Sequence, residues 1–134
     1  MPEGIPYASS NVIAGVGKDL NYVGEYCFAY SGAVQDAASS AASTVCLDFV
    51  TGNETIRGKL QFETDAFVSQ VFYLDVQFNG ISIFHAIWDH SPDKTLMQSP
   101  LRLIIPPYTN VKVLWGLTND TKNGYATFTG KLHK

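Results

Sequence analysis

Cysteine, export signals and long apolar runs are scarce or missing in this sequence. Its 134 residues include two cysteines, which are too few for a disulfide framework and lack the spacing of a zinc site. No segment approaches the ~18 continuous apolar residues of a membrane span, and the first residues lack the basic and apolar regions of a signal peptide. We therefore expect synthesis and folding in a cytoplasm. Cys27 and Cys46 should be free apolar thiols, unless their strands are neighbours and allow a bridge.

Positive charge is also scarce. Nine Lys and Arg stand against twelve Asp and Glu, which gives a formal net charge of -3, and no basic run is longer than an isolated Lys or Arg. A protein that neutralises a nucleic-acid backbone needs a cationic footprint. The sequence therefore predicts neither a nucleic-acid nor a membrane partner.

Aromatic residues reach 13% of the chain, and one stretch of it predicts a β-hairpin. Phe72, Leu74, Val76 and Phe78 alternate with polar residues, which is the period of a strand with one buried face. Asn79-Gly80 follows, and these two residue types tolerate the positive φ angles of a tight type I′ turn. We expect a strand over 72–78 that pairs antiparallel with a strand over 81–88.

Further stretches carry the composition or alternation of strands. They cover residues 22–34, 44–50, 56–63, 101–105, 111–117 and 125–132. Within 56–63 the alternation predicts Ile56, Gly58, Leu60 and Phe62 on one face. Eight short strands with no convincing helix indicate a single jelly-roll β-sandwich of antiparallel strands. An immunoglobulin-like sandwich is the alternative, but the sequence lacks its pairing of a central Trp with two widely spaced cysteines.

The chain divides into an irregular arm over residues 1–21 and the sandwich domain over 22–134. The arm has scattered apolar residues without a period, among them Ile5, Tyr7, Val12 and Ile13. Such a stretch cannot close a core of its own. Either it packs across the outside of the domain or it becomes ordered against a partner, in which case these four residues would bind that partner.

No set of residues has the pattern of a catalytic or metal site. His85, Asp89, His90 and Asp93 are the one cluster of metal-ligand types, and nothing marks further ligands for them. Ser, His and Asp occur without a nucleophile elbow, and no pattern marks Glu63, Asp65 and Asp75 as paired carboxylates. The sequence thus predicts no enzyme, no cofactor and no bound metal.

Aromatic side chains on alternating strands belong more often to the core than to a binding surface, and we expect this of Trp115. Trp88 and Tyr108 lie beside predicted loops. If they were exposed side by side, they could form a platform for a sugar ring. A carbohydrate-binding or host-adsorption module is therefore the alternative function.

Four segments together resemble small structural proteins of tailed bacteriophages. They cover residues 48–53, 56–62, 73–80 and 101–113, and the most specific is Ile104-Ile105-Pro106-Pro107-x-Thr109-x-Val111-x-Val113. The resemblance covers the chain from about Tyr22 onward.

The resemblance implies a capsid decoration, or cement, protein. Such proteins are single β-sandwiches, commonly trimeric, that sit on the capsid and clamp neighbouring major capsid subunits. The implied function is therefore a non-enzymatic virion protein on the capsid surface, with the major capsid protein and two further copies of the chain as partners. A minor capsid or tail-associated sandwich is another role compatible with the resemblance.

Overall fold

The computed structural model describes residues 19–35, 41–64, 71–88, 100–118 and 122–133, and every regular element within these ranges is a β-strand. The strands are β1 (Asn21–Val23), β2 (Tyr26–Tyr30), β3 (Val34–Gln35), β4 (Thr44–Val50), β5 (Thr55–Thr64), β6 (Phe72–Phe78), β7 (Ile81–Trp88), β8 (Leu101–Ile105), β9 (Asn110–Leu117) and β10 (Asn123–His133). The predicted all-β class is therefore confirmed. The described residues contain no helix that is long and apolar enough to cross a membrane.

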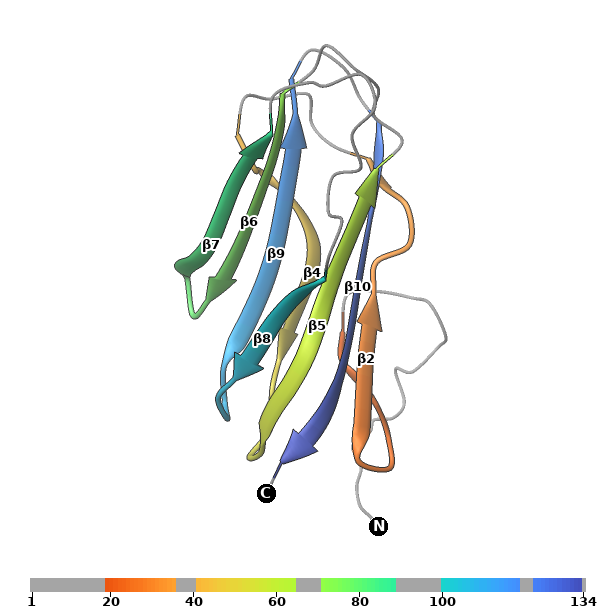
Figure 1. Cartoon of the computed structure of the whole chain (residues 1–134), viewed down its shortest axis with the longest axis vertical. Helices are drawn as coiled ribbons and strands as arrows, with labels where there is room; N and C mark the ends of the chain where they lie inside the picture. The colour runs from red at the N-terminus through yellow and green to blue at the C-terminus, as the bar shows by residue number, and fades with distance from the viewer. Residues whose placement is uncertain (1–18, 36–40, 65–70, 89–99, 119–121, 134) are drawn as a thin grey trace.

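The strands form two antiparallel sheets that pack face to face (Figure 1). The first sheet has the order β1-β2-β10-β5-β8, with β3 also paired to β10, and the second sheet has the order β4-β9-β6-β7. β10 is a central strand of the first sheet, because it pairs with β5 on one side and with β2 and β3 on the other.

The predicted hairpin is confirmed in its turn and in its strands. Asn79 and Gly80 have φ angles of 52° and 83°, as a type I′ turn requires, and Phe78 pairs with Ile81 across it. The register shifts between Val76 and Gln77, so β7 holds one residue more than an uninterrupted ladder would need.

The predicted alternation in β5 is confirmed as well. Ile56, Gly58, Leu60 and Phe62 are buried, whereas the residues between them are exposed or half-buried. The packing leaves no space for a side chain at Gly58, because the ring of Phe128 on β10 occupies the position where a Cβ would lie.

Aromatic rings from both sheets fill the core. Trp115 is fully buried, as predicted, and its ring centroid lies 5.4 Å from that of Phe62 and 5.8 Å from that of Phe72. Phe49 and Phe128 make a second contact between the sheets at 5.6 Å. These tilted arrangements are the ones that aromatic pairs favour, and they hold the two sheets together.

The segment 22–34 differs from its prediction because it contains three short strands. Gly24 and Gly32 have φ angles of 62° and 66°, a region that glycine enters without a steric cost. They turn the chain after β1 and after β2, so the described strands number ten instead of about eight.

Both cysteines are buried and neither forms a disulfide, as predicted. Cys27 lies on β2 in the first sheet and Cys46 on β4 in the second, so their strands are not neighbours within a sheet. Cys46 sits at a register shift of β4, which buries both Cys46 and Leu47. Burial raises the pKa of the Cys27 thiol to about 12.

The arm assigned to residues 1–21 is almost wholly outside the described residues, and so are Ile5, Tyr7, Val12 and Ile13. The first described strand begins at Asn21, the last residue of that segment.

Candidate interaction surface on the β6–β7 hairpin

Strand β7 is the last of the described strands at one side of the second sheet, and it exposes three isoleucines. Ile81 is 69% exposed, Ile83 is 45% exposed and Ile87 is 56% exposed. Ile83 falls at the register shift and has no direct partner on β6. An edge strand with exposed β-branched residues can pair with a further strand or receive an apolar partner surface.

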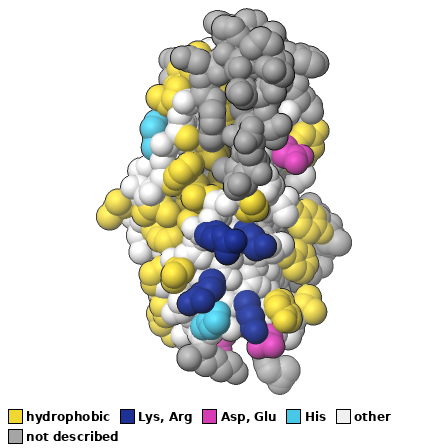
Figure 2. All heavy atoms as spheres, in the orientation of Figure 1, with side chains coloured by type: hydrophobic (Ala, Val, Ile, Leu, Met, Phe, Trp, Pro, Cys, Tyr) yellow, Lys and Arg dark blue, Asp and Glu magenta, His cyan; other side chains and the backbone are white. Residues whose placement is uncertain are grey.

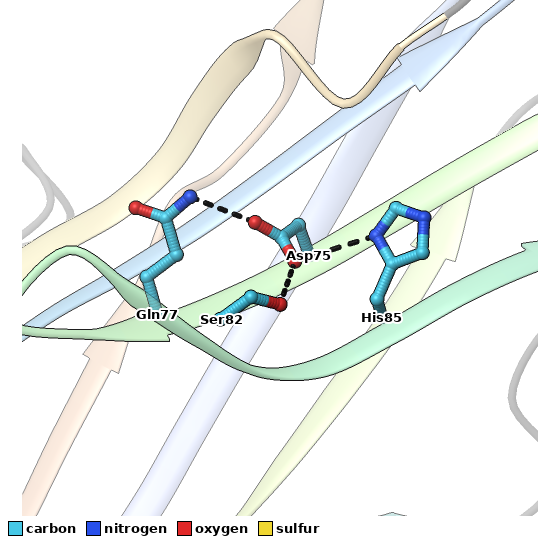
Figure 3. A network of polar contacts seen from close by, with 4 residues as sticks. All are labelled: Asp75, Gln77, Ser82 and His85. Carbon is cyan, nitrogen blue, oxygen red and sulfur yellow. Dashed lines mark hydrogen bonds and ion pairs between the residues drawn. The ribbon is translucent and has the colours of Figure 1, made fainter.

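A polar network joins β7 to β6 beside these isoleucines, and its centre is the carboxylate of Asp75 (Figure 3). The amide Nε2 of Gln77 donates to Asp75 Oδ2 at 2.7 Å, and the hydroxyl of Ser82 donates to Asp75 Oδ1 at 2.5 Å. His85 Nδ1 lies 3.4 Å from the same Oδ1. Asp75 thus contacts one side chain of its own strand and two of the neighbouring strand.

The network keeps the Asp75 carboxylate ionised. Its partial burial acts to raise the pKa, but the hydrogen bonds from Ser82, Gln77 and His85 and the charge of His85 outweigh burial, so the pKa is lowered from its ordinary value. A carboxylate that accepts this many hydrogen bonds ties the strands together in one register.

The three residue types Ser, His and Asp meet here, but in an order that differs from a nucleophilic triad. In a triad the imidazole lies between the hydroxyl and the carboxylate and takes the hydroxyl proton. Here the hydroxyl of Ser82 donates directly to Oδ1 of Asp75, and His85 contacts the same oxygen instead of lying between the hydroxyl and the carboxylate. This geometry fits a structural role for Ser82 in the hairpin.

The predicted sugar-binding residues do not lie side by side. Tyr108, 71% exposed with a φ of 54°, lies just before β9, which begins at Asn110. The backbone of Trp88 pairs with Phe72, which in turn pairs with Leu117 at the far end of β9. The nine steps from residue 108 to residue 117 span roughly 30 Å in an extended strand, so the two aromatics lie at opposite ends of the sheet.

The residues considered as metal ligands and as paired carboxylates are also not brought together in the described chain. His85 belongs to the Asp75 network, whereas Asp89, His90 and Asp93 lie outside the described residues. Within the described ranges, no three His, Cys, Asp or Glu side chains are placed to hold a metal ion. Of the carboxylates, Glu63 and Asp75 lie in different sheets, and Asp65 is outside the described residues.

Sequence reasoning missed the Asp75 network because of the register shift. An uninterrupted hairpin around Asn79-Gly80 would pair Asp75 with Phe84. The shift pairs it with His85 instead. The composition of the strands does not reveal the additional residue in β7 that causes the shift. The polar residues on β6 and β7 would nevertheless have suggested a contact between the two strands.

No known family model matches the chain, and no curated protein is significantly similar to it in sequence.

Proposed function

We propose that this protein is a non-enzymatic structural component of a virion, of the capsid decoration type, which forms a homotrimer and binds the major capsid protein at the capsid surface. The β7 edge carries the proposal. Strand β7 pairs with no described strand other than β6, and it exposes three isoleucines along its length, which makes it a strand edge suited to a subunit contact. The resemblance to structural proteins of tailed bacteriophages suggests which partner this contact serves.

We also propose that the two sheets form a jelly roll. If the two shortest strands, β1 and β3, are set aside, the orders are β2-β10-β5-β8 and β4-β9-β6-β7. Four strands in each of two facing sheets is the arrangement of a jelly roll. The strand order therefore supports this topology, although the fold alone does not imply the function.

The mechanism of such a protein is binding. A protein that binds the assembled capsid and not its separate subunits stabilises the assembly by RT ln(1 + c/Kd), where c is its free concentration. This task requires a rigid contact surface. The Asp75 network supplies rigidity, because it links β7 to β6 beside the isoleucines.

The proposal is tested by sedimenting the purified full chain with empty capsids of the virus that encodes it, and by measuring its mass in solution with light scattering. We expect a trimer that sediments with the capsids. Ile87→Lys should weaken retention at least tenfold, because it buries a charge in an apolar contact. Ile104→Lys is the matched control on β8 of the other sheet, where Ile104 is 62% exposed, and it should bind like the unchanged protein.

A monomer that stays in the supernatant at capsid-saturating concentrations would contradict the proposal. Equal losses in the two lysine variants would contradict the role of β7. The alternative, a carbohydrate-binding module, would need a surface other than one shared by Trp88 and Tyr108, because these residues lie at opposite ends of the second sheet.

A further inference from the structure

The outer face of the first sheet gathers positive charge that the sequence spreads over three strands. Arg57 and Lys59 on β5 face outward, Lys59 pairs with Arg102 on β8, and Arg57 pairs with Lys131 on β10. Figure 2 shows Lys and Arg side chains close together on this side of the molecule, with hydrophobic side chains to both sides. Four of the nine Lys and Arg of the chain therefore share one surface, which we call the cationic face.

No acidic residue interrupts the two rows of this face in the described strands. One row runs Arg102, Lys59, Thr129, Phe28 and Asn21, and the next runs Ile104, Arg57, Lys131, Tyr26 and Val23. The nearest outward acid on β5 is Glu63, four residues beyond Lys59, and Glu25 and Glu54 lie at the ends of β2 and β5. Within the described chain none of the four cations forms a salt bridge, so their charge is available to a partner.

Aromatic rings line the same face on β2. Tyr26, Phe28 and Tyr30 alternate outward, and the rings of Phe28 and Tyr30 are stacked with centroids 5.6 Å apart and planes within 9°. The ammonium of Lys131 lies 5.8 Å from the centre of the Tyr26 ring. The cations and the rings thus meet on one continuous surface.

The distance between the cations and the aromatic rings suits a flexible polymer that carries both negative charges and flat rings. One strand, β10, separates the aromatic strand β2 from the cationic strand β5, so these lie about 10 Å apart. Along β5, Arg57 and Lys59 are two residues apart, or roughly 7 Å. Such a polymer, lying along the sheet, could place its flat rings against the rings of β2 and its anionic groups against β5 and β8.

We propose that the cationic face binds single-stranded nucleic acid. Phosphates would contact Arg57, Lys59 and Arg102, and unpaired bases would stack on the rings of β2, which is how sheet platforms hold single strands. An acidic protein surface could use the cations but would leave the rings without a stacking partner. The inference goes beyond the proposed capsid function and does not depend on it.

The net charge of -3 does not oppose this binding. Charges in water are screened beyond about 8 Å at physiological ionic strength, so a bound phosphate responds to the nearby cations more than to distant carboxylates. The expectation of no nucleic-acid partner followed from the absence of basic runs. A strand, however, places alternate residues on one face, and a sheet joins residues distant in sequence.

The test is fluorescence anisotropy of the full chain with a labelled 20-nucleotide oligo(dT), over a series of salt concentrations. We expect saturable binding that weakens about 20- to 50-fold between 50 and 200 mM salt, as three or four neutralised phosphates of a single strand would give. The double variant Lys59→Gln/Arg102→Gln should weaken binding at least tenfold and make the dependence on salt shallower.

Two further variants separate charge from stacking. Tyr30→Ala should weaken binding at least fivefold and leave the salt dependence unchanged, because it removes a stacking surface and no charge. Lys112→Gln removes one positive charge from β9 of the other sheet and should bind like the unchanged protein. Thermal unfolding of each variant shows that the domain is still folded.

Three results would overturn the proposal: no binding of the oligonucleotide at 50 mM salt, an equal loss in Lys112→Gln and the double variant, or full binding in Tyr30→Ala. Binding of heparin without binding of the oligonucleotide would assign the face to a sulfated polysaccharide instead, and would equally reject a nucleic-acid partner.

Discussion

Asp75 shows how the one charged residue of strand β6 acquires a structural role. It faces outward between the inward-pointing Leu74 and Val76, and its carboxylate is largely covered by its own hydrogen-bond partners. A buried carboxylate without partners would be costly. Because Ser82 and His85 both lie on β7, the bonds that satisfy the charge also fix the hairpin register.

Replacement of this carboxylate should therefore destabilise the fold. Asp75→Asn replaces one of the two acceptor oxygens with an NH₂ donor, and we expect a loss of about 1–3 kcal/mol in the free energy of unfolding. Urea denaturation at neutral pH measures this. Glu63→Gln, an outward and exposed carboxyl on β5, is the control and should change stability little.

The same residue predicts a dependence of stability on pH. The pKa of Asp75 is lower in the folded than in the unfolded protein, so its contribution is present above the unfolded pKa and is lost as the pH falls through the folded pKa. In the acid range the stability of the unchanged protein should fall more steeply than that of Asp75→Asn. Parallel curves would contradict this role of the network.

At the scale of the strands, the two sheets approach so closely at β10 that a side chain has no space. A Cβ on Gly124 would lie 2.7 Å from the rings of both Phe62 and Trp115, which are themselves in contact. Gly124 thus leaves room for the contact between Phe62 of its own sheet and Trp115 of the facing sheet.

Gly124→Ala should therefore destabilise the domain by about 1–3 kcal/mol, the usual cost of overpacking a core. Gly52→Ala is the matched control, because no atom lies within 4 Å of a Cβ at Gly52. Thermal unfolding by circular dichroism compares the two variants. Equal stability of both variants would show that the rings shift aside at little cost.

The elements also show how far the sequence could predict this structure. Alternation predicted β5 and the β6–β7 hairpin, because each has one face in the core and one in water. It did not predict β1 and β3, since strands of three and two residues are too short to show a period. The cationic face and the separation of Trp88 from Tyr108 depend on which strands become neighbours, and local sequence does not encode that order.

At the scale of the whole molecule, the core is one cluster that both sheets share. Cys27 and Cys46 lie in this cluster on opposite sheets, so a reagent reaches both only when the sheets separate. The two thiols are therefore internal probes of global opening.

Both thiols should resist a chromogenic disulfide reagent in the native protein and react at a common rate that rises with urea. Burial and the raised pKa keep Cys27 in the unreactive thiol form until the domain unfolds. The single variants Cys27→Ala and Cys46→Ala would show which thiol each measured rate belongs to. A rate for one thiol that is faster and independent of urea would show local opening of one sheet.

The central place of β10 has a consequence for the rate of folding. Both β2 and β5 need β10 as a neighbour, so the first sheet cannot form until these three strands have met. The pairing of β10 with β2 joins segments about a hundred residues apart. Because the long intervening chain must be ordered before such contacts form, folding should be slow and the partly folded chain should be prone to aggregation.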